Sequence, residues 1–276
     1  MSASRCALLL ALWSGLGCEA SRYEQRVVVG GSSAMLPLVR HAAARFAELR
    51  PTITVEVIAG GSQLGLEQVE QGVIDIGDLD LPIPPDPGRV QLDDQPIAAT
   101  IFAVVSAAGP HLPPDRQLTS AQIAQIFSGE LVDWQEVGGA AGPIFVIDRP
   151  RSSGTRAVFV RQFFGGEDRL ARRVPIADSS GTVARTLAAL PGSISYVPVP
   201  YVRAPLVALA IDGVLPGKEA VTGGRYRFWE RGRMVTRRGA TRAARAFVDF
   251  VRSPDFQNHE IERLGYLPIT TVGEGP

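Results

Sequence analysis

The alternation of short apolar runs and helical segments in residues 26–80 constrains the fold most. Apolar runs at 26–31 and 52–61 each end in paired glycines, and a third run covers 73–80. Between these runs, residues 35–51 and 62–72 place apolar side chains at the 3.6-residue spacing of a helix. The order β-α-β-α-β predicts an α/β fold with a parallel sheet covered by helices on both faces.

The remainder of the chain repeats this alternation in a second cluster. A long apolar strand is expected at 96–107, followed by a helix capped by Thr119 or Ser120. The pattern then predicts further strands and helices, which are a strand at 143–149, a helix at 154–166, a helix at 178–192, a strand at 193–199 and two helical segments in 244–269. Two lobes, one for each cluster of strands and helices, are therefore expected.

Composition and the N-terminus restrict the classes of function. The chain has 276 residues and a formal net charge of zero, so no overall field attracts it to nucleic acid or to an anionic membrane. Residues 1–17 have the short apolar run of a signal peptide, and small residues precede Cys18, as at a lipoprotein processing site. Ordinary secretion with cleavage nearby is the alternative. We expect export with a lipid anchor on Cys18.

Cysteine usage excludes several kinds of chemistry. The two cysteines of the chain are Cys6 and Cys18, and both lie in this first segment. The mature chain then has no disulfide, no thiol nucleophile and no thiolate metal site. No later segment of the sequence is long and apolar enough to span a membrane.

Hydroxyl side chains stand at three expected helix starts. They are Ser32 and Ser33, then Ser62, and then Ser153, Gly154 and Thr155. Helix N-termini present unpaired N–H groups and a positive dipole end, which suits an oxyanion. Helix capping explains each turn taken singly, and Ser62 is expected as an N-cap. If the three turns face one cleft together with Arg149, they could surround a small tetrahedral anion.

Enzyme and nucleic-acid readings have little support in the sequence. The three histidines, His41, His111 and His259, do not lie at metal-ligand spacings, and no base stands near Ser153 in the sequence. The segment 225–245 contains eight arginines and three aromatic residues, an interleaving that can bind single-stranded nucleic acid. In a secreted protein of zero net charge, a solvated strand and helix face is the favoured interpretation. We expect neither an enzyme nor a cofactor or metal site.

Several motifs together resemble one family. The stretches GGSSAMLPL, AGGSQLGLEQVEQGVIDIGDLD and DRPRSSGT are similar to the anion-binding loops of the PstS-like phosphate-binding proteins of bacterial phosphate ABC transporters. FSGELVDWQEVGG, GSISYVPV, FVDFVRSP and LGYLPI resemble later landmarks of that family. Carried over position by position, the resemblance implies these phosphate contacts: Ser33, Ala34, Ser62, Asp80, Arg149, Ser153, Gly154 and Thr155.

The resemblance implies a two-lobe periplasmic-binding-protein fold, with a mostly parallel sheet in each lobe and the ligand in the cleft between them. Lobe I would comprise 25–97 plus 202–276, and lobe II would comprise 98–201. The implied function is capture of inorganic phosphate in the periplasm by a monomer that delivers it to ABC permease subunits. The alternatives are another oxyanion, such as sulfate or molybdate, or a role as a phosphate sensor. One departure from the family is an extra acid, Asp78, where a small residue is usual.

Asp80 is the residue expected to distinguish phosphate from sulfate. Phosphate near neutral pH keeps a proton that a carboxylate can accept, whereas sulfate is fully ionised and would meet a like charge. A site that depends on one such hydrogen bond can discriminate by about 10⁴ to 10⁵. The alternative is a carboxylate that only ends a strand and caps a turn.

Overall fold

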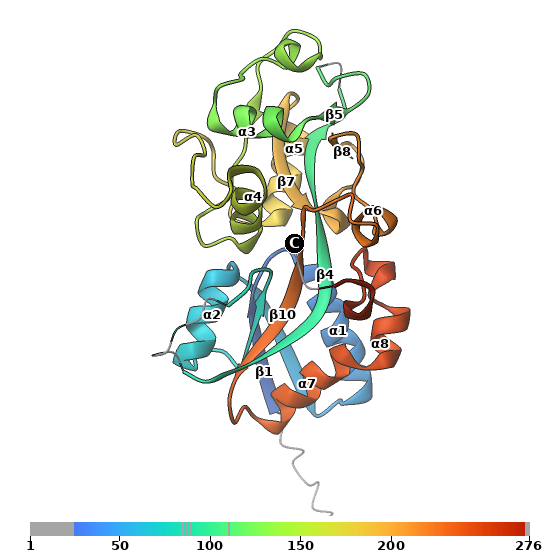
Figure 1. The fold of residues 1–276 in the computed structure, drawn as a ribbon. Coiled ribbons are helices and arrows are strands. Elements are labelled where there is room, and N and C mark those ends of the chain that lie inside the picture. The colour runs from blue at the N-terminus through green and yellow to red at the C-terminus, as the bar shows by residue number, and fades with distance from the viewer. Residues whose placement is uncertain (1–24, 84–85, 87, 89, 110, 274–276) are drawn as a thin grey trace, which may run out of the picture.

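Two lobes lie one above the other and are joined by two long strands (Figure 1). The computed structural model describes residues 25–83, 86, 88, 90–109 and 111–273. The expected signal peptide and Cys18 lie outside the described residues. The connecting strands are β4 (Leu92–Ala107) and β10 (Trp229–Arg237), which pair with each other in antiparallel fashion. A hinge motion between the lobes would have to pass through these strands.

The lower lobe contains the predicted β-α-β-α-β unit. Its sheet has the strand order β2-β1-β3-β10-β4, and β1 pairs in parallel with both β2 and β3. The unit consists of β1 (Gln25–Gly31), α1 (Leu36–Leu49), β2 (Ile53–Ala59), α2 (Ser62–Gln71) and β3 (Ile76–Leu79). The C-terminal helices α7 (Arg242–Arg252) and α8 (Pro254–His259) complete this lobe. The β-α-β-α-β order predicted for residues 26–80 is confirmed.

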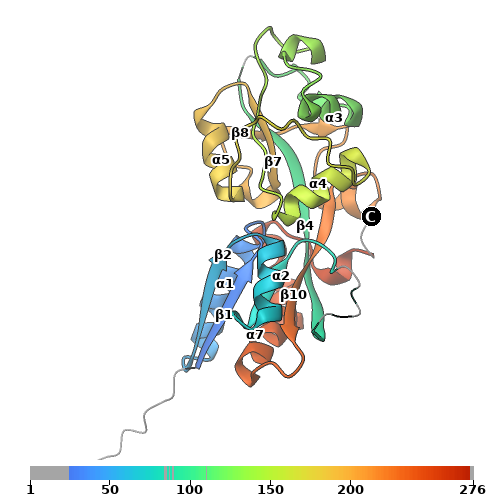
Figure 2. The same cartoon turned by 90° about the vertical axis from the view of Figure 1, so that its left-hand side faces the viewer.

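Helices cover both faces of the lower sheet, as the apolar strands require. On one face α2 buries Leu66 and Val69 against Leu79. On the other face α1 and α7 bury an apolar cluster that includes Leu38 and Phe247 (Figure 2). Successive residues of a strand point to opposite faces, so Ile76 and Leu79 of β3, which are three positions apart, belong to different cores.

The upper lobe is built around the other half of β4. Antiparallel β7 (Ser193–Pro198) and β8 (Leu206–Ala208) pair with β4, and β6 (Phe145–Val146) pairs in parallel with β7. A separate parallel pair consists of β5 (Gln117–Leu118) and β9 (Ala210–Ile211). The helical segments of this half are α3 (Ser120–Ser128), η1 (Trp134–Val137), α4 (Gly154–Phe164), α5 (Ser180–Ala189), η2 (Val199–Tyr201) and α6 (Lys218–Thr222). Two short turns near the C-terminus are η3 (Glu262–Leu264) and η4 (Ile269–Thr271).

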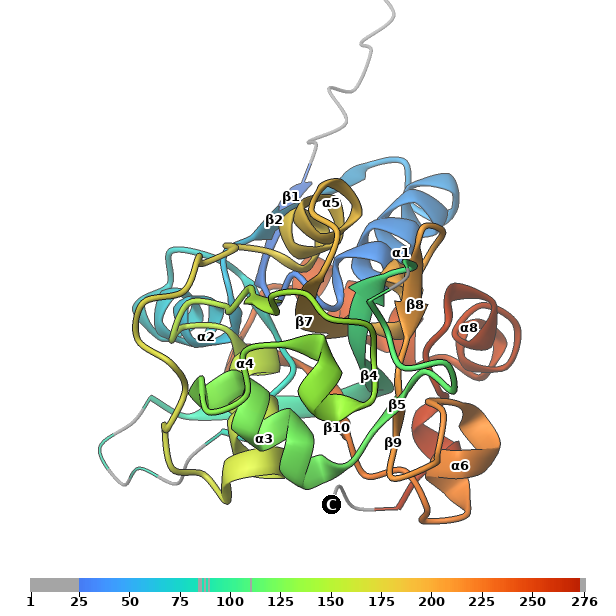
Figure 3. The ribbon, with the colours of Figure 1, turned by 90° about the horizontal axis from the view of Figure 1, so that it is seen from above.

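The strand β7 is buried along its whole length because helices lie on both of its sides (Figure 3). Tyr196 faces α3 and α4, where its ring stacks on Phe159 with centroids 4.1 Å apart. Val197 faces the opposite way and packs with Val183 and Leu187 of α5. This sheet therefore holds the starts of α4 and α5 in fixed places, which matters for the site below.

The strand pairs also show where the chain returns between the lobes. The segment after residue 202 was expected in lobe I. However, β8 lies beside the upper half of β4, and α6 packs with Tyr226 and Phe228 in the upper core. On these pairings we propose that the upper lobe extends to about residue 228, where the chain enters β10.

The arginine-rich stretch 225–245 begins as this crossing segment. Its aromatic residues Tyr226, Phe228 and Trp229 are buried, with exposures of 2%, 1% and 7%. Aromatic rings that stack on bases must be accessible. The three rings instead belong to the apolar core of the upper lobe.

Candidate anion-binding site

Loops from both lobes meet where the lower sheet ends. In an open α/β sheet, ligands bind outside the carboxyl ends of the strands. Here β1 is followed by Ser33, β2 by Ser62 and β3 by Asp80, and all three residues are buried. The upper lobe adds the loop from Asp148 to Thr155 and the start of α5. The structure thus brings the three hydroxyl-bearing turns to one interface, as the anion hypothesis requires.

Arg149 is a buried cation at the centre of this interface. Its exposure is 1%, and its Nη2 donates to the Ser33 Oγ at 3.1 Å across the two lobes. The other donors reach neutral oxygens, namely the Ala177 carbonyl at 3.0 Å, the Ser180 Oγ at 3.2 Å and the Asp178 carbonyl at 3.4 Å. Within the described ranges, no carboxylate forms an ion pair with Arg149.

Burial has the expected electrostatic effect on this arginine. Loss of water lowers the pKa of the Arg149 guanidinium, and the field of Tyr196 and the charge of Asp80 act in the opposite direction. A buried charge is costly unless an opposite charge pairs with it. The surroundings of Arg149 are therefore suited to an anionic ligand.

Asp80 faces the upper lobe from the end of β3. Its Oδ2 accepts a hydrogen bond from the Thr155 hydroxyl at 2.8 Å, and its Oδ1 accepts one from the Ser62 hydroxyl. A Cβ added at Gly154 would lie 1.9 Å from the Asp80 Oδ1 and 2.5 Å from the Ser62 Oγ. Only glycine allows this close approach, so Gly154 is essential for the two lobes to meet here.

The prediction that Ser62 caps a helix is wrong. The helix α2 begins at Ser62 itself, and Gly61 is the N-cap, with no side-chain hydrogen bond. The Ser62 hydroxyl is directed to Asp80 instead, and the Asp80 N–H donates back to the Ser62 Oγ at 3.2 Å. Ser62 is therefore the first residue of α2, and its side chain bonds to Asp80 at the interface instead of capping the helix.

Two other predicted positions make bonds inside their own lobes. Ser153 is the N-cap of α4, where its Oγ accepts from the Arg156 N–H at 3.3 Å. The Ala34 N–H donates to the Ser32 Oγ at 3.0 Å, and the Ala34 carbonyl accepts from the Tyr266 hydroxyl at 2.7 Å. Both Ser153 and Ala34 are buried at the interface and hold its loops in shape.

Sequence reasoning missed Ser180. Its N–H donates to the Ser33 Oγ at 3.0 Å, and its hydroxyl lies 3.3 Å from the same atom. The available signal was a repeated tetrapeptide, because Ser-Ser-Gly-Thr occurs at 152–155 and again at 179–182. Each copy opens a helix, but Ser153 caps α4 whereas Ser179 caps α5, which leaves the Ser180 side chain free to reach Ser33. Tyr201 was also missed, and its hydroxyl donates to the Ser33 carbonyl at 2.8 Å.

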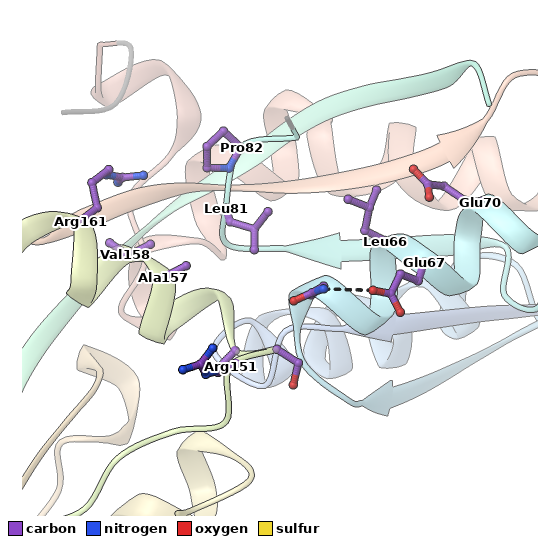
Figure 4. Close-up of a pocket in the computed structure, with 12 residues that line it drawn as sticks. Leu66, Glu67, Glu70, Leu81, Pro82, Arg151, Ala157, Val158 and Arg161 are labelled. Carbon is purple, nitrogen blue, oxygen red and sulfur yellow. Dashed lines mark hydrogen bonds between the residues drawn. The ribbon is translucent and has the colours of Figure 1, made fainter. Parts of the chain in front are cut away.

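A groove of about 410 Å³ flanks the site between α2 and α4. Its floor is apolar, with Leu66, Leu81 and Val158, and its rims carry Glu67 and Arg151 (Figure 4). The Gln63 N–H donates to the Ser152 carbonyl at 3.2 Å, which joins the two lobes beside the groove. The groove therefore lies outside the polar contacts around Arg149.

Metal-binding clusters and membrane-spanning helices are both missing from the described residues. Across the described ranges, no three His, Cys, Asp or Glu side chains are grouped so that they could hold a metal ion. In the same part of the chain, no helix has both the length and the apolar character needed to cross a bilayer.

A two-lobe α/β fold with a buried arginine and hydroxyl-bearing helix starts between the lobes defines a solute-binding protein with an anion site. Residues 19–255 match the model of the PBP superfamily domain. The chain belongs to this superfamily and, within it, to the family of PstS phosphate-binding proteins.

Sequence and structural relatives agree on this family. The chain is 36% identical over 250 residues to the phosphate-binding protein PstS of Bacillus subtilis, covering 89% of this chain and 81% of that protein. A substrate-binding protein of a phosphate ABC transporter from Clostridium perfringens, solved with bound phosphate, has a TM-score of 0.82 at 26% identity and covers 89% of this chain and 100% of its own. A phosphate transport receptor from Vibrio cholerae shares the fold, with a TM-score of 0.70 at 19% identity, and covers 87% of this chain and 99% of its own.

Proposed function

We propose that this protein captures inorganic phosphate between its lobes outside the cytoplasmic membrane and delivers it to the permease of an ABC transporter. The observation that carries the proposal is Arg149, a buried cation whose described hydrogen-bond partners are all neutral oxygens. The names of its relatives, which are phosphate-binding proteins, support phosphate as the anion.

In the proposed site, a cation binds the oxygens of the phosphate and a carboxylate accepts its proton. The guanidinium of Arg149 offers a planar pair of donors that matches two oxygens of a phosphate. The carboxylate of Asp80 offers an acceptor for the proton that phosphate retains at neutral pH. The proposed ligand contacts remain Ser33, Ala34, Ser62, Asp80, Arg149, Ser153, Gly154 and Thr155, all of them buried or at a buried helix start.

The anion is held and not transformed. The hydroxyl of Ser33 accepts from Arg149 and from the Ser180 N–H, and neither partner is a base that could activate it. The hydroxyl of Thr155 donates to Asp80, the carboxylate that we assign to the proton of the phosphate. The relatives are binding proteins, which supports the same conclusion. A carrier must also release its cargo intact.

Attachment to the membrane would come from the N-terminus. Acylation of Cys18 would place the anchor before β1, which begins at Gln25. Mass spectrometry of the membrane fraction tests this part separately. A soluble protein whose unmodified N-terminus begins at another residue would contradict the anchor and leave phosphate capture unaffected.

Titration calorimetry of the purified mature protein tests the ligand. Phosphate, arsenate, sulfate and molybdate are titrated at one ionic strength, because anion binding is screened by salt. We expect tight binding of phosphate, comparable binding of arsenate and rejection of sulfate. Preference for sulfate or molybdate would replace phosphate with another oxyanion, and the absence of any binding would overturn the proposal.

A further inference from the structure

Asp78 is a second carboxyl beneath the anion site. It lies on β3, opposite Gly31 of β1 and Met234 of β10, and its exposure is 1%. Asp80 follows two residues later, close enough that its charge acts on Asp78. None of the contacts described above uses the side chain of Asp78.

The surroundings of this carboxyl offer little to an ionised group. Among the described residues, the Asp78 Oδ1 is buried and has no hydrogen-bond partner. The atom lies over the backbone of Gly31, because a Cβ added there would be 2.6 Å away. The Ser32 N–H bonds to the Asp78 carbonyl at 2.8 Å, and the only donors that act on the carboxyl are this N–H and that of Asp78 itself, among the described residues. An ionised carboxylate in such a place loses water without gaining enough donors.

The charged and titratable groups nearby do not compensate. On β10, Met234 lies opposite Asp78, while Arg233 lies opposite Leu79 and pairs with Asp94 at 2.5 Å. The side of α1 that packs on the sheet is apolar, and its His41 pairs with Glu260 at 3.0 Å. Glu67 and Glu70 of α2 line the groove described above, and α2 packs on the other face of the sheet through Leu79.

Two tyrosines and one arginine complete the surroundings. Burial raises the pKa of Tyr266 well above its usual range and that of Tyr201 to about 12, so both are neutral. Their hydroxyls donate to the carbonyls of Ala34 and Ser33. Arg149 is bonded to Ser33 and faces the position proposed for the ligand. Among the described neighbours, no cation is left to neutralise Asp78.

We propose that Asp78 serves the site as a protonated carboxyl, so that phosphate binding is coupled to a proton on Asp78 and is tight only where this residue stays neutral. The inference rests on the proposed function. Phosphate brings its negative charge next to Asp80, and an ionised Asp78 would add a further like charge in a medium that screens poorly. Burial raises the pKa of Asp78 well above its ordinary value, and the charge of Asp80 raises it further, although the N–H groups of Asp78 and Ser32 act against this.

The test compares Asp78→Asn with the wild type in calorimetric titrations with inorganic phosphate at about pH 5.5, 7.0 and 8.5. The ratio of the two dissociation constants cancels the ionisation of phosphate itself. We expect a constant ratio at the acidic end. Above the pKa of Asp78 in the free protein, wild-type affinity should fall relative to the variant by up to about tenfold per pH unit.

A matched control is Asp75→Asn. Asp75 precedes β3 at its other end, where its Oδ2 accepts from the Val28 N–H at 2.8 Å. The ratio of the phosphate dissociation constants of this variant and the wild type should not change with pH. Asp78→Ala serves as a second variant, because it removes the carboxyl without adding an amide, and it should show the same pH dependence as Asp78→Asn.

The outcomes separate this inference from the proposed function. If both Asp78 variants bind phosphate tightly and their ratios to the wild type do not change with pH, the role of Asp78 is overturned and phosphate capture stands. If folded wild-type protein binds no phosphate at any of the three pH values, the proposed function fails, and this inference fails with it.

Discussion

The Nε of Arg156 donates to the Oδ2 of Asp148 at 3.0 Å, and this ion pair closes the loop that carries Arg149. The Oδ1 of the same carboxylate accepts from the Tyr196 hydroxyl at 2.5 Å, and Arg156 also reaches Asp168 at 2.7 Å. Asp148 stands before the loop and Arg156 stands in the first turn of α4. The pair therefore sets the distance between the guanidinium of Arg149 and the helix start.

We expect Arg156→Gln to loosen this loop. Asp148 is buried whereas Arg156 is only partly buried, so the change should cost about 1–3 kcal/mol in the free energy of unfolding, which is the cost of leaving a buried acceptor unsatisfied. Phosphate binding should also weaken, because the donors of Arg149 and of α4 would no longer be held together. Urea unfolding and calorimetry measure the two effects. The control is Arg169→Gln in the exposed Arg169–Glu167 pair, which should cost no more than about 1 kcal/mol.

Arg149→Lys should weaken phosphate binding by about a hundredfold and leave the fold intact. An ammonium group carries the charge but cannot reproduce the planar pair of donors. Hydrogen bonds to charged groups are worth about 1.5–3 kcal/mol each, which accounts for the size of the effect. Calorimetry gives the affinity, and circular dichroism gives the fold. An unchanged dissociation constant would contradict the role of Arg149.

Asp80→Asn should reduce the preference for phosphate over sulfate, mainly because sulfate would be admitted. The amide keeps the shape, removes the like charge and adds a donor. Phosphate loses a charged acceptor in the same change. The measurement is a pair of titrations of each protein at one ionic strength. If the ratio of the two affinities stays the same, Asp80 is not the acceptor of the phosphate proton.

Gly154→Ala should prevent the lobes from meeting and abolish tight binding. The added Cβ would lie 1.9 Å from the Asp80 Oδ1, and neither the helix start nor the buried carboxylate can move aside cheaply. Gly181→Ala is the matched control, because it stands at the same place in the second Ser-Ser-Gly-Thr. Its Cβ would come no nearer than 3.5 Å to the flexible side chain of Arg185. Equal affinities of the two variants would contradict the close contact.

Asp78→Asn should also change how the stability of the ligand-free protein depends on pH. The pKa of Asp78 is raised in the folded state, so folding favours its protonated form. This contribution is complete below the unfolded value of about 3.9 and is lost as the pH rises through the raised folded value. Urea unfolding should therefore show the wild type losing stability relative to the variant from about pH 4 towards neutral pH. If the difference in the free energy of unfolding between the two proteins is the same at each pH, the pKa of Asp78 is not raised by folding.

Local patterns in the sequence were sufficient for the elements and for part of the site. The β-α-β-α-β unit follows from runs of apolar residues and from glycines at their ends, which act within a few residues of the chain. The caps of α3 and α4 are likewise interactions between near neighbours. The sequence offered Thr119 or Ser120 for α3 and Ser152 or Ser153 for α4, and the structure selects Thr119 and Ser153. The arginine loop was recognisable because its hydroxyls, glycine and guanidinium lie within seven residues, 149–155.

Only the tertiary structure decided which of these groups meet. Ser33 and Ser180 are 147 residues apart in the chain, yet their Oγ atoms lie 3.3 Å apart. No local pattern in the sequence predicts this contact. Ser62 was expected as a cap because serine commonly fills that position. Its hydroxyl instead donates to Asp80, which faces the upper lobe. The neutral hydrogen-bond partners of Arg149 and the unpartnered Oδ1 of Asp78 arise from burial between layers and lobes. Burial is a property of the packed molecule, whereas capping and periodicity belong to the chain itself.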